Sequence, residues 1–419
     1  MREFDDSNIS RTLLTFLLLY LFLFFIAQYK CFRDPTSAFF QPSRAFAPAY
    51  STVRLDQAER YLQDSSDREN YSPPSKDEKH PTTCVGIATV ARKGARYFKH
   101  AVGSVLDGLS ESERADIHLV LFIAHTDPSQ HPAYEEEWLR KVPDQLLLYD
   151  NATVDIEYIR SLETDAARQY AREKPLFDYT YLLKSCAAVN APYVVMLEDD
   201  ILAMDGWYHR TRQALASADQ QTAAKGASIW LYLRLFYTEQ LLGWNAEEWL
   251  TYLSLSILTV ALVAGVLLGA RYCQPKLLGA LLPDRTLLAL CGICTPLLIG
   301  LFFAAGRVTM LPIPAGVHEM PRFGCCSQGF VFPRDRIPDL VKLYEEERTG
   351  YVDMITEDFA NKHDEIRWAV TPSVIQHVGR KSSKEALHKQ KPKQGLGVED
   401  IWNFAFELND AEALRQGHI

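Results

Sequence analysis

The chain has 419 residues, which is enough for one large domain or two of ordinary size. Its formal net charge of -9 argues against a nucleic-acid-binding protein, because such proteins usually present a basic surface. Hydrophobic residues make up an ordinary 47% of the sequence, but they are concentrated in three apolar blocks, which points to membrane segments beside a polar folded part.

The first apolar block comprises residues 12–29, and it carries no charge over a length that can cross a bilayer as a helix. Lys30 follows directly, and the nearest small residues suited to signal cleavage, Ala45 and Ala47, lie too far downstream. We therefore predict an uncleaved signal anchor. Residues 33–81 are rich in proline, serine and charge, which is typical of a stem that contains at most a short helix around residues 55–62.

Folded character begins at Cys84. In chain order we predict a buried strand at 84–90, a turn at 91–94, a helix at 97–109, strands at 117–124 and 146–149, and a helix at 165–190. This order of strands and helices indicates the start of a doubly wound α/β layer. Asn151-Ala152-Thr153 is an N-glycosylation sequon, which is usable only on the lumenal or extracellular side of a membrane.

Three consecutive carboxylates, Glu198, Asp199 and Asp200, follow an apolar run at residues 193–197 that has the length and character of a buried strand. Ligands of open α/β sheets bind beyond the carboxyl ends of strands, and acidic residues are rarely buried unless they are paired or bind a cation. Carboxylate oxygens at this place suit Mn²⁺ or Mg²⁺, which neutralise a diphosphate, so the pattern favours a nucleotide-sugar site. The alternative is a strand that ends in a solvated acidic turn.

The α/β pattern continues with a strand at 229–237 and is then interrupted by two more apolar blocks of membrane-crossing length, at 249–270 and 286–306. The connector 271–285 carries three basic residues against Asp284, and short basic loops stay on the cytoplasmic side. Both flanking regions are then lumenal, and the chain's N-terminus is cytoplasmic. The alternative is a pair of buried core helices. Cys291 and Cys294 have CxxC spacing, but inside an apolar run we interpret them as small residues of a membrane helix.

Beyond these blocks the polar pattern returns. We predict a turn and strand at 325–332, helices at 336–347 and 352–361, and a last strand at 368–378 that ends near His377. Residues 389–393 are basic and contain proline, as in a solvated loop.

Several of these segments, taken in order, closely resemble blocks of the N-acetylglucosaminyltransferase IV family. The matching segments are residues 86–93, 182–186, 197–201, 352–355 and 372–379 together with Ser382 and Ser383. The chain departs from that family in having an apolar hairpin between the two halves. A transferase domain split in this way behind an N-terminal anchor resembles the Golgi enzymes that add an N-acetylgalactosamine side branch to glycosylphosphatidylinositol (GPI) anchors.

The resemblance implies a GT-A (Rossmann-like) α/β glycosyltransferase domain split by an inserted transmembrane hairpin, plus an N-terminal transmembrane anchor. It implies a Golgi membrane enzyme with a lumenal catalytic domain, a UDP-sugar donor, a GPI-anchored protein as acceptor, Mn²⁺ or Mg²⁺ as cofactor, and inversion at the transferred hexosamine. The expected parts are a cytoplasmic tail (1–11), an anchor (12–29), a stem (30–82), a first transferase part (83–248), two spans (249–270 and 286–306) around a cytoplasmic loop (271–285), a second transferase part (307–390) and a C-terminal segment (391–419).

Roles for the donor site follow from the same resemblance. Asp200 is expected to bind the metal, Asp199 to face the ribose, and Glu198 to support the site through hydrogen bonds. His377 is a second metal ligand or a diphosphate contact, although a lone histidine is more often an ordinary packed residue. The turn at residues 89–93, which includes Thr89, Arg92 and Lys93, is expected to meet the uracil and ribose. Lys184 is a further donor contact or a solvated helix lysine.

An inverting transfer needs one general base to remove the proton of the acceptor hydroxyl. Asp353 is the first candidate from its place in the resembling block, with Glu357 and Asp358 as alternates. Asp353 and Glu357 share a face of the predicted helix at i, i+4 spacing, so the choice between them stays open. A solvated acidic helix face is the alternative for each of the three.

Three other classes of protein compete with this interpretation. Another lumenal glycosyltransferase, acting on N-glycans or glycolipids, would keep the fold and metal but change the acceptor. A non-catalytic membrane scaffold could use the same fold, since fold does not decide function. A transporter is a poor fit, because this chain has too few apolar spans and they carry no charge. The donor sugar stays open, as does disulfide pairing among Cys84, Cys186, Cys325 and Cys326.

Overall fold

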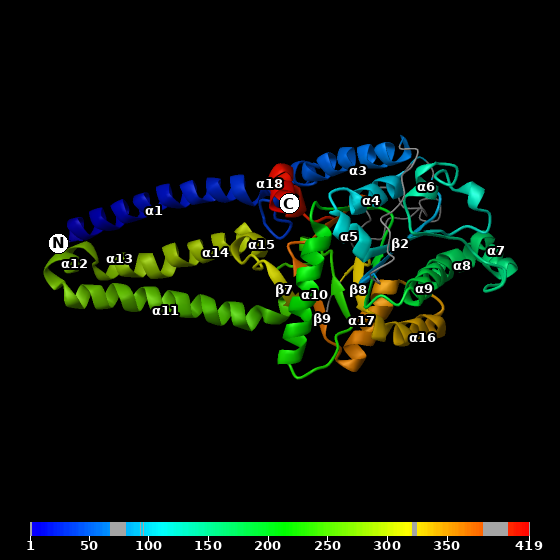
Figure 1. Ribbon diagram of the computed structural model, residues 1–419. Coiled ribbons are helices and arrows are strands. Elements are labelled where there is room, and N and C mark those ends of the chain that lie inside the picture. The colour runs from blue at the N-terminus through cyan, green and yellow to red at the C-terminus, as the bar shows by residue number, and fades with distance from the viewer. Residues whose placement is uncertain are drawn as a thin grey trace. The chain divides into compact units, whose positions relative to one another are not determined.

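The structure is a computed structural model that describes residues 2–67, 81–92, 94, 96–320, 325–379 and 401–418 (Figure 1). The chain divides into two compact units. The first, here called the helical unit, comprises Met1–Ala47 and Glu239–Ile313. The second, here called the α/β unit, comprises Pro48–Thr238 and Pro314–Ile419.

The α/β unit is built on an eight-stranded sheet in which every strand except β8 and β7 runs in the same direction. A second, two-stranded antiparallel sheet joins β5 and β10. From edge to edge the large sheet contains β3 (Gln145–Leu147), β2 (Ile117–Ile123), β1 (Thr83–Thr89), β4 (Tyr193–Leu197), β8 (Gly329–Pro333), β6 (Tyr232–Arg234), β9 (Arg367–Thr371) and β7 (Gly316–Glu319), and the small one contains β5 (Ile201–Ala203) and β10 (Ile375–His377).

Helices cover both faces of the large sheet, which is why its central strands are apolar on both sides. Alternate residues of β1 and β2, such as Ile87 and Leu121, pack into a core with α4 (Tyr97–Leu106) and α10 (Trp207–Ala224). The intervening residues, such as Phe122, pack into a second core on the other face. The helices of that second face are α9 (Glu173–Ala188), α16 (Ile337–Glu347) and α17 (Val352–His363).

Most predicted strands and helices of this unit are present, and two differ for identifiable reasons. The helix predicted at 165–190 is two helices, α8 (Ala166–Tyr170) and α9, because Arg172 between them has a left-handed backbone with a φ of 63°. The last strand, predicted at 368–378, is divided into β9 and β10 at Pro372, which has no N–H to donate to a ladder.

A larger difference concerns the expected stem. Residues Tyr50–Asp67 form an 18-residue helix, α3, which packs against α4. Ala58 and Leu62 are completely buried, and so is Arg54, whose Nε donates to the carbonyl of Ala203 at 2.9 Å. This part of the chain therefore belongs to the α/β unit. Its polar composition conceals the helix because only a narrow face of it is buried.

The remaining helices of the α/β unit are short. They are α5 (Glu111–Asp116), α6 (Trp138–Lys141), α7 (Ile156–Thr164) and α18 (Ala411–His418). A disulfide between Cys84 on β1 and Cys186 on α9 joins the sheet to a covering helix, and a second one joins the neighbours Cys325 and Cys326. These pairs settle the cysteine pairing that the sequence left open.

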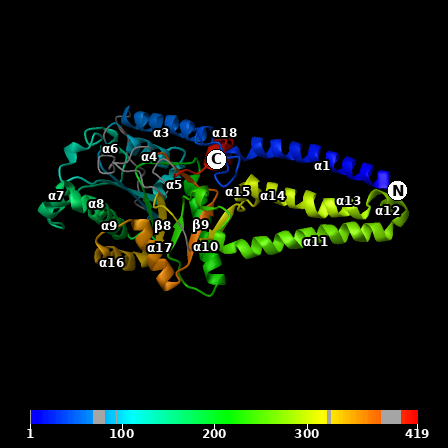
Figure 2. The ribbon, with the colours of Figure 1, turned by 180° about the vertical axis from the view of Figure 1, so that it is seen from behind.

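The helical unit contains three helices that are long and apolar enough to cross a membrane. They occupy Ile9–Arg33, Glu239–Cys273 and Asp284–Ala305, in agreement with the three predicted blocks. Within this unit α11 and α14 run side by side, as Figures 1 and 2 both show. Its helices are α1 (Arg2–Lys30), α2 (Pro42–Ala45), α11 (Trp249–Cys273), α12 (Pro275–Leu281), α13 (Asp284–Ala289), α14 (Thr295–Ala305) and α15 (Arg307–Met310).

The CxxC pair lies inside the last of these apolar segments. Cys291 and Cys294 belong to a π-helical turn, Leu290–Cys294, that connects α13 to α14, and both are free thiols. The turn continues the helix, as the interpretation of these cysteines as small membrane-helix residues requires.

Candidate active site

The acidic triplet lies where the sheet changes its direction of winding. The chain proceeds from β1 to β2 and β3 on one side and then crosses to β4 on the other side of β1. Such a switch point, at the carboxyl ends of the strands, is where open α/β sheets bind their ligands. Glu198, Asp199 and Asp200 follow the end of β4, and Thr89 is the last residue of the adjacent β1.

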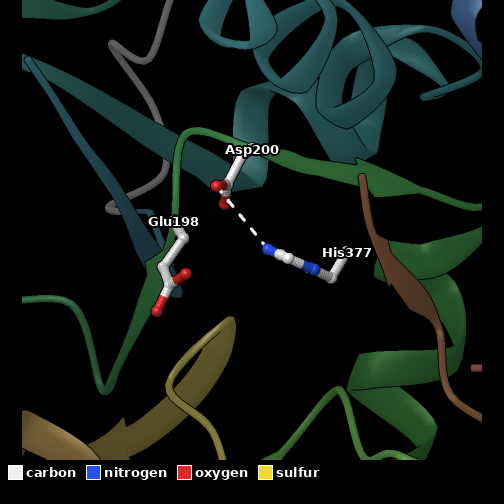
Figure 3. A group of neighbouring side chains, drawn as sticks. All are labelled: Glu198, Asp200 and His377. Atoms are coloured by element: carbon white, nitrogen blue, oxygen red, sulfur yellow. Dashed lines mark ion pairs between the residues drawn. The ribbon is translucent and has the colours of Figure 1, made fainter. Parts of the chain in front are cut away.

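The small sheet brings His377 to this place. β10 pairs with β5 so that His377 is opposite Ile201, the residue directly after Asp200. The backbone N–H of Val378 donates to the carbonyl of Asp200 at 2.8 Å and extends this pairing. As a result Nε2 of His377 lies 3.6 Å from Oδ2 of Asp200, and Figure 3 shows the ring and the carboxylate facing each other near Glu198.

Glu198, Asp200 and His377 fit a divalent cation. One potential ligand atom from each lies within 4.8 Å of the other two. An ion held about 2.1–2.5 Å from its ligands can bridge atoms up to about 5 Å apart. Oδ1 of Asp200 is also buried without a hydrogen-bond partner among the described residues, which is costly unless a ligand satisfies it.

The orientation of His377 supports this assignment. Its Nδ1 lies 2.9 Å from the carbonyl oxygen of Ile401, to which it donates. In the neutral imidazole this hydrogen bond leaves the lone pair on Nε2, which is the nitrogen that faces Asp200. A backbone carbonyl behind a histidine is a common way of orienting a metal ligand.

Gly379 leaves space for the side chains of Asp200 and His377. A Cβ at this position would collide with the carboxylate of Asp200 and with the His377 ring. Glycine is therefore required by the close approach of the backbone rather than by its own conformation. Its position next to the last strand in the sequence does not reveal this requirement.

Arg92 and Thr89 hold the middle carboxylate. The Thr89 hydroxyl donates to Oδ2 of Asp199 at 2.6 Å, and Nη2 of Arg92 lies 2.7 Å from Oδ1. The same Nη2 is 3.4 Å from Oδ2 of Asp200. The other two guanidinium nitrogens of Arg92 are buried and have no partner among the described residues, so they are available to a ligand.

The pKa values of the three acids are shifted in different directions. Burial raises the pKa of Glu198 to about 7, with the charge of Asp200 adding to the effect. Burial also raises the pKa of Asp199 to about 6, against the opposing charge of Arg92. Burial raises the pKa of Asp200 as well, but the hydrogen bond and charge of a protonated His377, helped by Arg92, outweigh it and lower that pKa. Asp200 is therefore the member whose charge the site is built to hold. The neutral imidazole with its Nε2 lone pair is the form that a bound cation would require.

A loop before β8 connects the triplet to the first candidate base. Ser327 donates to Glu198 at 2.5 Å, and the backbone N–H of Cys326 donates to Oδ2 of Asp353 at 3.0 Å. Asp353 is the second residue of α17 and is half-buried. Its negative charge also contributes to the raised pKa of Glu198, as expected for neighbouring acids.

The two alternate bases occupy different environments. Glu357 is buried, with its oxygens 2.7 Å from nitrogens of Arg234 and Arg367, and Tyr232 also donates to it. Both oxygens of Glu357 are thus already engaged by side chains of the α/β unit. Asp358 is exposed on another side of α17. The placement thus favours Asp353 over both alternates.

Two predicted donor contacts are not gathered here. Lys184 is exposed on α9, forms an ion pair with Glu345, and lines a second pocket in the α/β unit. This placement argues against Lys184 as a donor contact. Lys93 lies outside the described residues.

The sequence did not single out His131, which forms a hydrogen bond with the Thr89 hydroxyl that also donates to Asp199. The N–H of Ala133 donates to its Nδ1, so Nε2 carries the proton and donates to Thr89 Oγ1 at 3.1 Å. Burial, together with the charges of His125 and Arg92, lowers the pKa of His131 to about 4, and the ring is neutral at pH 7. A lone histidine between two predicted elements carries no local signal of such a role.

The fold and the site together define a class of protein. Two carboxylates and a histidine gather at the switch point of a parallel-rich α/β sheet, in a chain with three apolar helices. This combination is typical of a membrane-bound enzyme whose active site can hold a cation. Comparison with known proteins makes that enzyme a transferase. A family model described as GPI-N-acetylgalactosamine transferase PGAP4 matches residues 83–376, well over half of the chain, and the chain belongs to this family.

A curated relative is a transferase as well. The chain is 27% identical over 133 residues to alpha-1,3-mannosyl-glycoprotein 4-beta-N-acetylglucosaminyltransferase A from Xenopus tropicalis. The match covers 30% of this chain and 25% of that enzyme, so the chain spans about a quarter of the relative's length. The similarity agrees with the resemblance to the N-acetylglucosaminyltransferase IV family.

Proposed function

We propose that this protein transfers N-acetylgalactosamine from a UDP-sugar to the glycan of GPI-anchored proteins, with inversion and with the help of a divalent cation. The observation that carries the proposal is the group Glu198, Asp200 and His377 at the switch point of a chain that belongs to a GPI-N-acetylgalactosamine transferase family.

The strand order supports a GT-A domain. The segment β3-β2-β1-β4 has the parallel 3-2-1-4 order of a nucleotide-binding half. Thr89 and Arg92 follow β1, and the acidic triplet follows β4, so the donor would lie across the carboxyl ends of these two strands. In this arrangement Asp199 receives the ribose. The two nitrogens of Arg92 that have no partner among the described residues bind the ribose hydroxyls or the diphosphate.

The ligand set favours Mn²⁺ over Mg²⁺, because imidazole nitrogen suits the former whereas the latter prefers oxygen alone. Asp200, His377 and Glu198 would hold the ion. When bound, it supplies Lewis-acid stabilisation of the leaving diphosphate. Arg92 adds a second positive charge beside the same phosphates.

Asp353 is the proposed base. One of its oxygens is held by the Cys326 N–H, which orients the carboxylate, and the other oxygen has no hydrogen bond to the described residues and would face the acceptor. It takes the proton from the acceptor hydroxyl as that oxygen bonds to the anomeric carbon and the bond to the diphosphate breaks. Attack from the face opposite the leaving group inverts the anomeric configuration.

We further propose that the α/β unit is lumenal and resides in the Golgi. The disulfide Cys84–Cys186 fits an oxidising compartment. Asn151 is exposed in a turn between β3 and α7, where an oligosaccharide can be attached. The basic connector between the apolar helices fits the cytoplasmic side. Removal of an N-glycan by endoglycosidase, abolished by Asn151→Gln, would check this orientation.

The hairpin between the two halves of the domain suits an acceptor that is anchored in the membrane. The family match extends across the hairpin, which supports its being part of the enzyme rather than an insertion peculiar to this chain. A rival acceptor is an alpha-1,3-mannosyl glycoprotein, because that is what the name of the Xenopus relative describes. The rival keeps the same donor site and changes the acceptor only.

The test is a donor-hydrolysis and transfer assay on the purified full chain in detergent, with a panel of UDP- and GDP-sugars and Mn²⁺. We expect Mn²⁺-dependent turnover of UDP-N-acetylgalactosamine, at least 10²-fold lower in Asp200→Asn. Asp358→Asn, an exposed acid outside the site, is the matched control. A folded protein without turnover and without metal-dependent nucleotide binding would favour the non-catalytic scaffold.

A further inference from the structure

A second pocket lies in the α/β unit and shares no residue with the acidic site. It has a volume of about 760 Å³, which is within the range of small-molecule and sugar sites. Its walls come from the turn after β3, from α7, from the exposed face of α9 and from the C-terminal end of α16. No role in the proposed transfer depends on this pocket.

Aromatic rings form one wall of the pocket. The rings of Phe177 and Tyr181 on α9 are nearly parallel, at 9° and 6.3 Å between centroids, and Tyr158 of α7 packs edge-on against Phe177. All three are half-buried. The hydroxyl of Tyr181 donates to the Leu148 carbonyl at 3.2 Å and that of Tyr158 donates to Glu173 at 2.7 Å. These bonds hold the rings in place, so the wall is preorganised.

Charged groups of both signs surround the rings. Lys184 of α9 pairs with Glu345 of α16 across the pocket, and Arg348 follows α16 with a left-handed φ of 62°. The lining acids Asp155, Glu173 and Glu345 outnumber these two cations, which disfavours a phosphate-rich ligand. Flat aromatic faces beside hydrogen-bonding groups instead suit a pyranose ring, which has an apolar C–H face and a rim of hydroxyls.

Two tyrosines connect this pocket with the proposed catalytic groups. Tyr344 lines the pocket and contacts the half-buried Tyr179 of α9 edge-on, with 5.9 Å between the ring centroids. Burial raises the pKa of Tyr179, and Tyr344 and the charges of Glu198 and Asp353 add to the effect. The Tyr344 hydroxyl also bonds with Thr356 of α17, the helix that carries Asp353. Tyr344 therefore contacts both the pocket and the helix that carries the proposed base.

We propose that this pocket binds an uncharged sugar residue of the acceptor glycan, away from the hydroxyl that receives the new sugar. The inference rests on the proposed transferase function. A branched acceptor glycan can occupy both places, and its binding in the pocket would align the reacting hydroxyl with Asp353. The pocket then contributes to acceptor affinity and not to donor binding.

The same pyranose chemistry has a second source in the chain itself. Thr153, which belongs to the sequon at Asn151, lines the pocket. An N-glycan attached to Asn151 would begin close by. The experiment must therefore distinguish a sugar of the acceptor glycan from the chitobiose core of the protein's own N-glycan. A mannose disaccharide is the uncharged probe for the former, because the name of the Xenopus relative describes a mannosyl acceptor.

The direct test is saturation-transfer NMR on the full chain in detergent, with α1,2-mannobiose and N,N′-diacetylchitobiose as probes. We expect mannobiose binding that weakens at least tenfold in Tyr181→Ala and in Arg348→Gly. Glycine tolerates the left-handed backbone at position 348, so the second variant keeps the fold. Tyr181→Phe keeps the ring and should stay within about threefold, and Arg210→Ala, exposed on α10, should not change binding.

The outcomes separate this inference from the transferase proposal. If wild-type protein binds mannobiose but turns over no UDP-sugar, the transferase proposal fails and the glycan pocket stands. If turnover is normal and mannobiose binding is absent, or is unchanged in both pocket variants, the pocket proposal is overturned. Binding of chitobiose alone, or mannobiose binding that appears only in Asn151→Gln, overturns the acceptor assignment in favour of the protein's own glycan.

Discussion

The three acidic residues near the start of α17 show how strongly environment separates similar side chains. Asp353 accepts a hydrogen bond from Cys326 and borders the site, Glu357 is neutralised by two buried arginines, and Asp358 is exposed to solvent. Their spacing in the sequence cannot distinguish them. The tertiary contacts place one acid beside the candidate site, one among buried arginines and one on the surface, and the first is the one that we propose as the base.

Asp353→Asn should lower kcat for sugar transfer by about 10²–10⁴, because the amide cannot accept the acceptor's proton. Binding of Mn²⁺ and of UDP should be unchanged, since neither depends on Asp353. Steady-state transfer kinetics and nucleotide titrations measure the two effects. Asp358→Asn on the same helix is the control and should behave as wild type. Transfer by the Asp353 variant at the wild-type rate would exclude this residue as the base.

The lowered pKa of His131 predicts how the stability of the folded protein depends on pH. Its pKa of about 4 in the folded protein is below the ordinary value near 6.5, so the unfolded chain binds the proton first as the pH falls. The stabilising contribution is present above pH 6.5 and is lost as the pH falls towards 4. His125, whose pKa burial also lowers, acts in the same direction.

The raised pKa values of Glu198 and Asp199 act in the opposite direction over the same range, so the prediction concerns the difference between variants. We expect His131→Gln to lose less unfolding free energy in detergent between pH 7 and pH 5 than the wild type, by on the order of 1 kcal/mol. The exposed His209→Gln should leave the pH profile as it is in the wild type. An identical pH profile for the His131 variant would show that this histidine is not held neutral by the fold.

At the scale of elements, the crossing of α3 and α4 places residues of the expected stem within the α/β unit. The helices approach so closely that a Cβ on Gly103 would collide with the backbone carbonyl of Ala58. Gly103 is inside α4, where alanine would ordinarily be the better helix former by about 1 kcal/mol. The packing requirement opposes the helix propensity here.

Gly103→Ala should accordingly destabilise the protein by about 1–3 kcal/mol, because overpacking outweighs the gain in propensity. Gly417→Ala in α18 is the matched control, since nothing lies within 4 Å of a Cβ there. It should be neutral or slightly stabilising. Thermal unfolding of both variants measures the difference, and equal melting temperatures would mean that α3 does not pack on α4.

The pairing of β5 with β10 is the other element on which the site depends. It aligns His377 with the residue after Asp200, although the two halves of the site are separated in the chain by the apolar helices. Because Ile375 and Ile201 are fully buried, the register of this short ladder is fixed by the core. The geometry of the cation site therefore depends on ordinary packing.

At the scale of the whole molecule, the three apolar helices bear on the choice of acceptor. A GPI-linked substrate is confined to the membrane, and a transferase that is itself anchored meets it at a high effective concentration. The proposal that the hairpin has this purpose can be tested separately from the chemistry.

Replacement of α11 to α14 by a short soluble loop should leave UDP-sugar hydrolysis within about threefold but reduce transfer to GPI-anchored proteins in membranes at least tenfold. A hairpin of scrambled sequence, with the same length and apolar composition, is the control and should retain transfer. Metabolic labelling of GPI-anchored proteins in cells that lack the native enzyme provides the measurement. Equal transfer by the loop variant would contradict the proposed role of the hairpin.

The sequence by itself determined the features that depend on local composition and period. These are the three apolar helices, the apolar strands of the sheet and the acidic triplet at the end of β4, because hydropathy and strand length are properties of neighbouring residues. The ordered blocks also carried the resemblance that the family match later confirmed.

Only the tertiary structure decided which distant side chains meet. The ladder of β5 and β10 brought His377 to Asp200, the end of β1 brought Thr89 to Asp199, and two buried arginines pair with Glu357. Helix α3 and the aromatic pocket likewise follow from packing between segments far apart in the chain. Such contacts are set by sheet register and by the shape of the core, which no local pattern encodes.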